Sequence, residues 1–210
     1  MTIKLHHLNA SRSLRILWLL EEIQQPYELK SYLRDKSTRL APEDLKHVHP
    51  LGKSPVLELN GKVIVESGAI VEILIQKFAP HLAPDPLDDA YLDYLQWIHF
   101  SESSAMVPYL LKMFNGIEQR QGTQFKFLDG YAETEFKKVF SYLDDYLSDK
   151  TFLLAERLTG ADFMLGFVVF GVVEALNIKG KYLNIEQYLN RLQQLDSWQR
   201  AMHIEATLLK

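Results

Sequence analysis

The amino-acid sequence predicts two parts, an α/β domain over residues 1–79 and an all-α region over residues 88–210. Strand and helix patterns alternate in the first part, and only helical periodicity is found in the second. Between them lies a stretch with three prolines and no periodicity. Residues 80–87 are therefore expected to be the linker between two domains.

The first domain opens with a strand, a helix and a second strand. Residues 3–7 and 27–32 have strand patterns, and residues 13–24 between them have the periodicity of an amphipathic helix. Pro42 suits the first turn of a short helix that ends before Pro50. This order resembles a thioredoxin-like domain, in which a mixed four-stranded sheet is covered by helices.

A hairpin motif is the most informative part of the chain. Ser54 and Pro55 precede an apolar strand, a turn follows at residues 60–61, and Glu66 and Ser67 stand where the next helix should begin. Proline has no backbone N–H for a sheet, so Pro55 belongs at a bend or an edge, and its peptide bond is a candidate for the cis form. Ser67 is a suitable N-cap, and the amides of a helix start attract an anion.

The second region begins with two long helices. Residues 88–113 are predicted to form the first, with a kink at Pro108, and residues 125–147 the second, with apolar residues on one stripe. The lengths and the absence of competing strand signals predict a helical bundle.

A capping box marks the start of the third helix. Thr159 is the expected N-cap, and Asp162 occupies the third helical position. The run over residues 163–173 is almost wholly apolar but shorter than the roughly 20 residues that cross a bilayer. We therefore expect a helix that is buried on all sides.

These motifs resemble the glutathione transferase family over nearly the whole chain. In that family the residue before a cis-proline pairs its backbone with the cysteinyl part of glutathione, and an acidic residue followed by serine binds the γ-glutamyl end. A cation beside the proline meets the glycyl carboxylate in some relatives, and a segment near the dimer axis of bacterial members matches residues 97–108. The resemblance implies that the glutathione-binding residues are Lys53, Ser54, Pro55, Glu66, Ser67, Glu102 and Ser103, with Glu102 or Ser103 acting across the subunit interface.

The chain contains no cysteine, which excludes the branches of the family that use a thiol of their own. A ligand thiol must then be activated, and a free thiol with a pKa of about 8.5 is mostly protonated at neutral pH. A hydroxyl at a helix N-terminus stabilises the thiolate. We assign this role to Ser11, because its distance from Arg15 matches the bacterial serine-type transferases. Ser13 stays an alternative donor, and Ala10, the position that other serine branches use, cannot serve.

The resemblance also implies that the protein is a homodimer that conjugates glutathione to a small hydrophobic electrophile. The electrophile pocket is expected to be lined by Met106, Tyr109, Leu110 and Met113. Two alternatives remain: a glutathione-dependent isomerase or peroxidase on the same fold, and a non-catalytic member that mediates protein interaction. The intact motifs at residues 54–55 and 66–67 argue against the second alternative.

Composition and sequence narrow the possible partners, location and cofactors of the protein. A net charge of −4 argues against nucleic acid as a partner. The N-terminus lacks the apolar run of a signal peptide, so we expect a cytoplasmic protein without a membrane partner. His6 and His7 should point to opposite faces of a strand, and His47 and His49 do not form a recognised metal-ligand motif, so no metal is expected.

Overall fold

The computed structural model describes residues 1–154, 156–176 and 178–208, and it divides into two compact units. The first unit comprises Met1–Leu82 together with Gln193–Lys210, and the second comprises Ala83–Leu192. The boundary near residue 82 agrees with the expected linker. The sequence-based division differs at the C-terminus, where it had placed all of residues 88–210 in one helical domain.

The first unit contains a mixed four-stranded sheet in the order β2-β1-β3-β4. The central strand β1 is parallel to β2 and antiparallel to β3, and β3 continues antiparallel into β4. Asn60 and Gly61, which connect the last two strands, both have positive φ, as a tight two-residue hairpin turn requires. The strands are β1 (Ile3–Leu8), β2 (Glu28–Tyr32), β3 (Val56–Leu59) and β4 (Lys62–Ile64).

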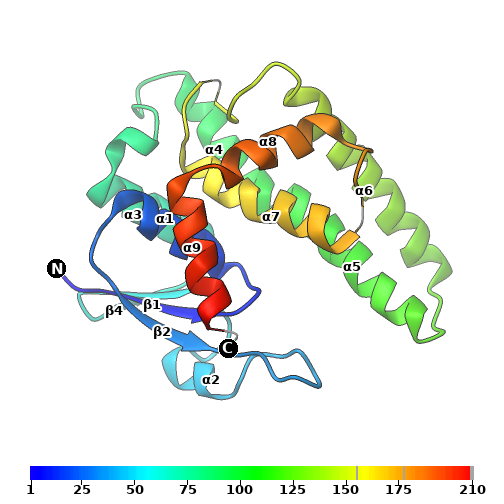
Figure 1. Ribbon diagram of the computed structural model, residues 1–210, viewed down its shortest axis with the longest axis horizontal. Helices are drawn as coiled ribbons and strands as arrows, with labels where there is room; N and C mark the ends of the chain where they lie inside the picture. The colour runs from blue at the N-terminus through cyan, green and yellow to red at the C-terminus, as the bar shows by residue number, and fades with distance from the viewer. Residues whose placement is uncertain (155, 177, 209–210) are drawn as a thin grey trace. The chain divides into compact units, whose positions relative to one another are not determined.

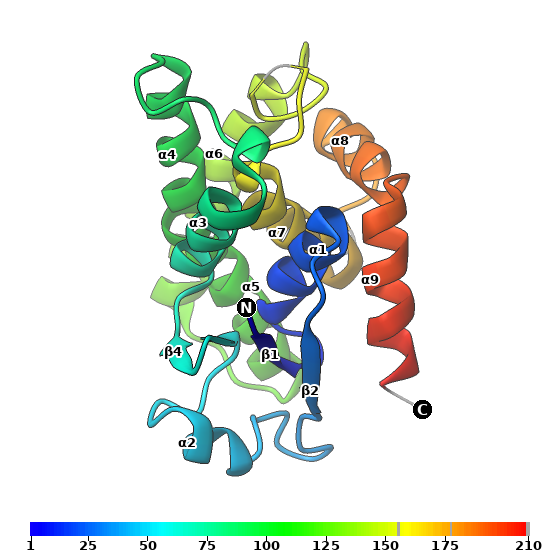
Figure 2. The same cartoon turned by 90° about the vertical axis from the view of Figure 1, so that its left-hand side faces the viewer.

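Helices cover both faces of this sheet, as Figures 1 and 2 show. Leu8, Tyr32 and Leu45 form an apolar cluster that joins α2 to one face, and the other helices lie on the opposite face. The order of elements confirms the predicted thioredoxin-like arrangement. The helices of this unit are α1 (Ser13–Ile23), α2 (Asp44–Val48), α3 (Ser67–Phe78), the short 3₁₀ helix η1 (Pro80–Leu82) and α9 (Asp196–Thr207).

The C-terminal helix α9 belongs to the first unit because it packs along α1. The buried indole of Trp18 donates its Nε1–H to Ser197 Oγ over 3.0 Å, and its ring meets Trp198 edge to face with centroids 4.9 Å apart. Arg200 Nε lies 3.0 Å from Glu21 Oε2 at the same interface. These pairs join residues about 180 positions apart, which no local sequence pattern reveals.

The second unit is helical. The first long helix is interrupted by a π-helical turn over Ser101–Ala105, upstream of the kink predicted at Pro108, and it continues beyond the predicted end to Arg120. Proline removes the N–H that would bond four residues back, so the irregularity falls before Pro108 rather than at it. The helices are α4 (Ala90–Phe100), the π turn η2 (Ser101–Ala105), α5 (Met106–Arg120), α6 (Lys126–Tyr146), α7 (Gly160–Leu176) and α8 (Leu183–Gln193).

The predicted capping box at the start of α7 is confirmed. Asp162 Oδ2 accepts hydrogen bonds from the backbone N–H of Thr159 over 2.8 Å and from its Oγ1 over 3.0 Å. Asp162 Oδ1 accepts from the Leu153 amide over 2.9 Å and from the Tyr188 hydroxyl over 2.8 Å. One fully buried carboxylate therefore ties α7 to α8 and to the preceding loop. Among the described helices, none has both the length and the apolar character needed to cross a membrane.

Candidate active site

The two candidate serines lie where the loop after β1 passes into α1. Ser13 is the first residue of α1 and is fully buried, whereas Ser11 lies in the loop and is 7% exposed. Their hydroxyl oxygens are 2.9 Å apart, and Ser11 Oγ also accepts the Ser13 backbone N–H over 3.2 Å. Ser13 Oγ further contacts His7 Nδ1 at 2.9 Å and both backbone polar atoms of Leu8. Of the two hydroxyls, that of Ser13 is therefore the more completely enclosed by the protein.

Behind the serines lies a histidine, hydrogen-bonded to a glutamate, that the sequence did not predict as part of a site. His7 is fully buried, and its Nε2 lies 2.5 Å from Glu205 Oε2 on α9. The other carboxylate oxygen of Glu205 accepts the Ala10 N–H over 2.7 Å. The only sequence signal for this contact is strand alternation, which sends His6 and His7 to opposite faces as predicted. His6 pairs instead with Glu58 and Tyr32.

The Ser54–Pro55 peptide bond is cis, as the motif predicted. Pro55 is buried, and Ser54 Oγ donates to the carbonyl of His6 over 2.8 Å. Ser54 Oγ also accepts from the Leu8 amide over 3.2 Å, and the same amide lies 3.1 Å from Ser13 Oγ. The proline turn and the serine loop thus meet at the end of β1, while Lys53 beside them is exposed.

The start of α3 differs from the prediction in one respect. Ser67 was expected to be the N-cap, but it is the first helical residue, and Glu66 occupies the cap position with φ 70° and ψ 111°. A non-glycine residue in that region costs about 1–3 kcal/mol and is held there by its surroundings. The reason is a tertiary contact: the buried Arg15 of α1 donates from Nη1 to Ser67 Oγ over 2.9 Å. This bond places the N-termini of α1 and α3 side by side, with the Glu66 side chain exposed.

A half-buried arginine holds the serine loop from the other side. Arg34 donates to the carbonyl of Asn9 over 3.1 Å and to that of Ala10 over 3.2 Å, and its own amide bonds to Asn9 Oδ1 over 2.7 Å. Burial and then the charges of Arg39 and Arg12 lower the pKa of Arg34, while Glu205 acts against them. Arg34 therefore adds positive charge near the loop that carries Ser11.

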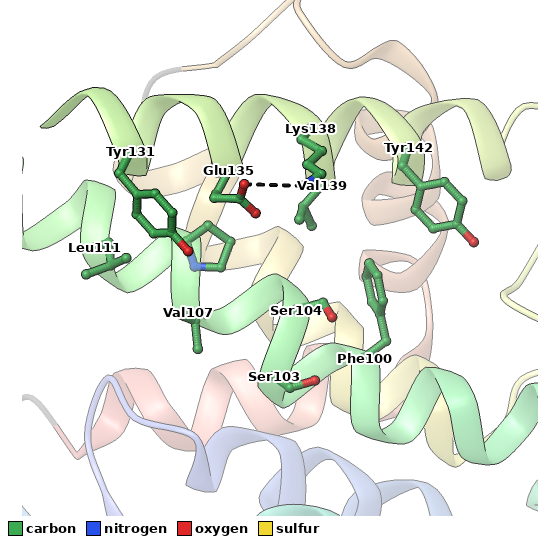
Figure 3. A pocket seen from close by; sticks show the side chains of 11 residues that line it. Phe100, Ser103, Ser104, Val107, Leu111, Tyr131, Glu135, Lys138, Val139 and Tyr142 are labelled. Atoms are coloured by element: carbon green, nitrogen blue, oxygen red, sulfur yellow. Dashed lines mark hydrogen bonds and ion pairs between the residues drawn. The ribbon is translucent and has the colours of Figure 1, made fainter. Parts of the chain in front are cut away.

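In the second unit, Ser103 lines an open pocket of about 410 Å³. Figure 3 shows Phe100 and Ser103 on one wall, with Tyr131 and Tyr142 of α6 on the other. Ser103 Oγ donates to the carbonyl of His99 over 2.9 Å. Glu102 precedes it in the same π turn and is partly exposed.

The four residues predicted to bind the electrophile do not line this pocket. Met106 and Tyr109 are buried, while Leu110 and Met113 are partly exposed. Met106, Leu110 and Met113 recur every three or four residues and so share one face of α5. Their role in binding an electrophile therefore stays a prediction. Among the described residues, no group of three or more His, Cys, Asp or Glu side chains could hold a metal ion.

The chain thus combines a thioredoxin-like unit, which has a cis-proline turn beside a serine loop, with a unit of long helices. Residues 1–75 match the family model of the glutathione S-transferase N-terminal domain, and residues 106–196 match that of the C-terminal domain. Glutathione S-transferase 3 of Schizosaccharomyces pombe is 33% identical to this chain over 208 residues, which cover 89% of this chain and 81% of that protein.

Solved structures agree. A glutathione S-transferase from Actinobacillus pleuropneumoniae is 33% identical and superposes with a TM-score of 0.86, covering 98% of this chain and 93% of that chain. A glutathione transferase from Phanerochaete chrysosporium, solved in complex with oxidised glutathione, is 20% identical with a TM-score of 0.81, covering 98% of this chain and 97% of that chain. The chain belongs to the glutathione transferase family.

Proposed function

We propose that this transferase binds glutathione at the end of β1 and uses Ser11 to stabilise the thiolate, which then attacks a small hydrophobic electrophile. The observation that carries the proposal is the convergence of the serines and the cis-proline turn on the end of β1, with the start of α3 tied to α1. The serine loop and the cis-proline turn both contact the Leu8 amide, and Arg15 ties the start of α1 to the start of α3.

Each group of glutathione then has a partner of matching chemistry. The backbone of Ser54 next to Pro55 pairs with the cysteinyl part, Glu66 and Ser67 bind the γ-glutamyl end, and Lys53 meets the glycyl carboxylate. Glu66 is exposed at the N-terminus of α3 and makes no side-chain capping bond there. Its carboxylate is thus available to the ligand's ammonium group, and the helix N-terminus favours the adjacent carboxylate.

The chemical step needs a negative sulfur close to a hydrogen-bond donor. Ser11 lies at the N-terminus of α1, where the hydroxyl and the helix macrodipole both favour the thiolate over the thiol. A donor that bonds more strongly to the charged form lowers the thiol pKa and leaves the binding of the peptide part unchanged. The exposure of Ser11 and the enclosure of Ser13 favour Ser11 as the donor.

Paired serine variants test this assignment. Ser11→Ala should raise the thiol pKa of bound glutathione, followed by ultraviolet thiolate absorbance against pH, and should lower kcat with little change in glutathione affinity. A titration that moves with Ser13→Ala and not with Ser11→Ala would transfer the role to Ser13. If neither variant moves it, the serine-type mechanism fails for this protein.

Calorimetry tests the binding residues. Glu66→Ala should weaken glutathione binding by about 1.5–3 kcal/mol, the worth of a hydrogen bond to a charged group, with little effect on stability. Glu72→Ala, on the same helix and partly buried away from the cap, is the matched control. No detectable heat from folded wild-type protein at millimolar glutathione would contradict the proposal.

Three further parts of the proposal concern the whole protein. We infer a homodimer in which Glu102 or Ser103 reaches the ligand of the other subunit, and light scattering showing only the 24.3 kDa monomer would contradict it. Substrate profiling should show conjugation of electrophiles, such as aryl halides, faster than isomerisation or peroxide reduction. Met106, Tyr109, Leu110 and Met113 remain the proposed electrophile pocket, and a cytoplasmic location is the expected one.

A further inference from the structure

Four side chains of the first unit form one continuous chain of hydrogen bonds, and the mechanism above uses only its outer end. Ser11 Oγ lies 2.9 Å from Ser13 Oγ, which lies 2.9 Å from His7 Nδ1. His7 Nε2 in turn lies 2.5 Å from Glu205 Oε2. None of the four residues is more than 8% exposed, so the hydrogen-bonded chain lies almost wholly out of contact with bulk water.

The carboxylate fixes the direction of the innermost bond, which joins His7 to Glu205. Burial alone would raise the pKa of Glu205, but the hydrogen bond and charge of His7, the Ala10 amide and the charge of Arg34 hold it below its ordinary value of 4.5. Glu205 is therefore ionised at neutral pH and can only accept hydrogen bonds. His7 Nε2 must carry a proton, and Nδ1 of the neutral imidazole is an acceptor.

With neutral His7, every group in the chain is satisfied in one direction. Ser13 donates to His7 Nδ1 and accepts from the Leu8 amide, 3.1 Å away, and from the Ser11 hydroxyl. Ser11 Oγ also accepts the Ser13 backbone N–H over 3.2 Å. A hydroxyl oxygen accepts two hydrogen bonds, so Ser11 keeps one acceptor position for a thiol S–H.

With protonated His7, the same contacts are satisfied in the opposite direction. His7 Nδ1–H donates to Ser13 Oγ, which still accepts from the Leu8 amide and donates to Ser11 Oγ. The Ser11 hydroxyl proton then points out of the chain, toward an acceptor. Each serine therefore has partners in both directions, and the Leu8 carbonyl, 3.2 Å from Ser13 Oγ, is a further acceptor for the Ser13 proton.

We propose that His7, paired with Glu205, accepts the proton of the glutathione thiol through Ser13 and Ser11. The S–H bond breaks and its proton moves to Ser11 Oγ, while the Ser11 proton moves to Ser13 and the Ser13 proton to His7 Nδ1. The thiol becomes a thiolate and the imidazole becomes an imidazolium beside the ionised Glu205, with no change in total charge. The reversed chain then presents the Ser11 hydroxyl as a donor to the thiolate.

The relay rests on the proposed function, since it requires the sulfur to lie against Ser11. His7 and Glu205 act through the serines and not on the substrate, so they are positioning residues. Among the described residues, the charge that acts on Glu205 besides His7 is that of Arg34, which follows β2 and lies near the charges of Arg39 and Arg12. Arg34 stabilises the ionised form of Glu205, which in turn stabilises the imidazolium.

A proton inventory on the wild-type protein tests the relay without any substitution. The heat of glutathione binding is measured near neutral pH in buffers of different ionisation enthalpy, which gives the number of protons released. The thiolate formed is measured by ultraviolet absorbance. Binding of S-methylglutathione, which has no thiol, corrects for protons from other groups. We expect thiolate to form with close to zero protons released per thiolate. Release of close to one proton per thiolate would overturn the relay.

Matched variants locate the proton acceptor. Glu205→Gln keeps the shape but removes the charge, so the thiol pKa of bound glutathione should rise by about one unit, a roughly tenfold loss of thiolate well below that pKa. Glu58→Gln alters the analogous pair with His6, 2.6 Å apart, whose side-chain bonds lead to Tyr32 and not to Ser11 or Ser13, so the titration should be unchanged. Equal shifts in both variants would overturn the proposal.

The two proposals fail differently. If Ser11→Ala leaves the thiolate titration unmoved, the assignment of Ser11 is wrong, and the relay falls with it. If Ser11→Ala raises the thiol pKa while wild-type protein releases one proton per thiolate, Ser11 is the donor but the proton leaves for solvent, and only the relay is refuted. In His7→Gln, glutathione binding should release close to one proton per thiolate formed, instead of close to none.

Discussion

Gly171 provides a sharp test of helix packing in the second unit. A Cβ added at Gly171 of α7 would lie 2.7 Å from the Tyr109 hydroxyl oxygen, 3.0 Å from Cζ and 3.2 Å from Cε1. Tyr109 on α5 is 8% exposed, and burial raises the pKa of its phenol. The ring therefore has little room to move away, and Gly171 permits the close approach of the two helices.

The expected effect of Gly171→Ala is the sum of two opposing terms. Alanine favours a helix over glycine by about 1 kcal/mol, while overpacking a filled site costs about 1–3 kcal/mol. The variant should thus lose about 0–2 kcal/mol of unfolding free energy. Gly130→Ala, in the interior of α6 with open space at its Cβ position, should instead gain up to about 1 kcal/mol.

Urea unfolding followed by circular dichroism measures both variants, and their difference isolates the packing term at about 1–3 kcal/mol. Tyr109→Phe deletes the nearest of the three atoms, so Gly171→Ala should cost less in that background than in the wild type. The reasoning would be refuted if Gly171→Ala stabilised the protein as much as Gly130→Ala does.

Three other outcomes follow from buried polar groups. Asp162→Asn places an amide N–H against two of the four donors that now bond to the carboxylate. Urea unfolding should therefore show a loss of about 2–6 kcal/mol of unfolding free energy. The control Asp145→Asn, at an exposed residue, should change this free energy by less than about 0.5 kcal/mol. The folded pKa of Glu205 lies below 4.5, so its contribution to stability is present above that pH and lost as the pH falls through the folded pKa. The melting temperature should therefore fall less steeply with acid in Glu205→Gln than in the wild type, and an equal fall would contradict this reasoning. Ser197→Ala removes the hydroxyl that accepts from the buried Trp18 indole N–H, which should cost about 1–3 kcal/mol and alter tryptophan fluorescence. Ser148→Ala on the surface should do neither.

Local sequence patterns were sufficient for most of the fold. Strand alternation, the Asn60–Gly61 turn and the capping box at Thr159 and Asp162 depend on residues a few positions apart, and each is found in the structure. These features are set by backbone chemistry, which neighbouring residues determine. The cis bond before Pro55 is different, because local chemistry made it only a candidate and the family resemblance implied it.

Predictions that depended on distant contacts were less complete. Ser67 has good N-cap chemistry, yet its hydroxyl is bonded to Arg15, 52 positions earlier, and the helix starts one residue sooner than a serine cap would place it. α9 has an ordinary amphipathic pattern that does not say which partner it packs against. Its place beside α1 depends on Trp18 and Trp198, whose contact follows only from the assembled first unit.

Contacts between residues distant in sequence also decide the roles of His6 and His7. Both are buried histidines of β1 paired with a glutamate. Because side chains alternate between the two faces of a strand, one points toward Tyr32 and the other toward Ser13. The glutamate that completes the serine chain lies 198 positions from His7, beyond residue 196, where the match to the family's C-terminal model ends. Membership of the family therefore does not imply a carboxylate at this point. If the relay operates, it depends on the C-terminal helix being part of the first unit, because only that packing brings an ionised group to the buried side of His7.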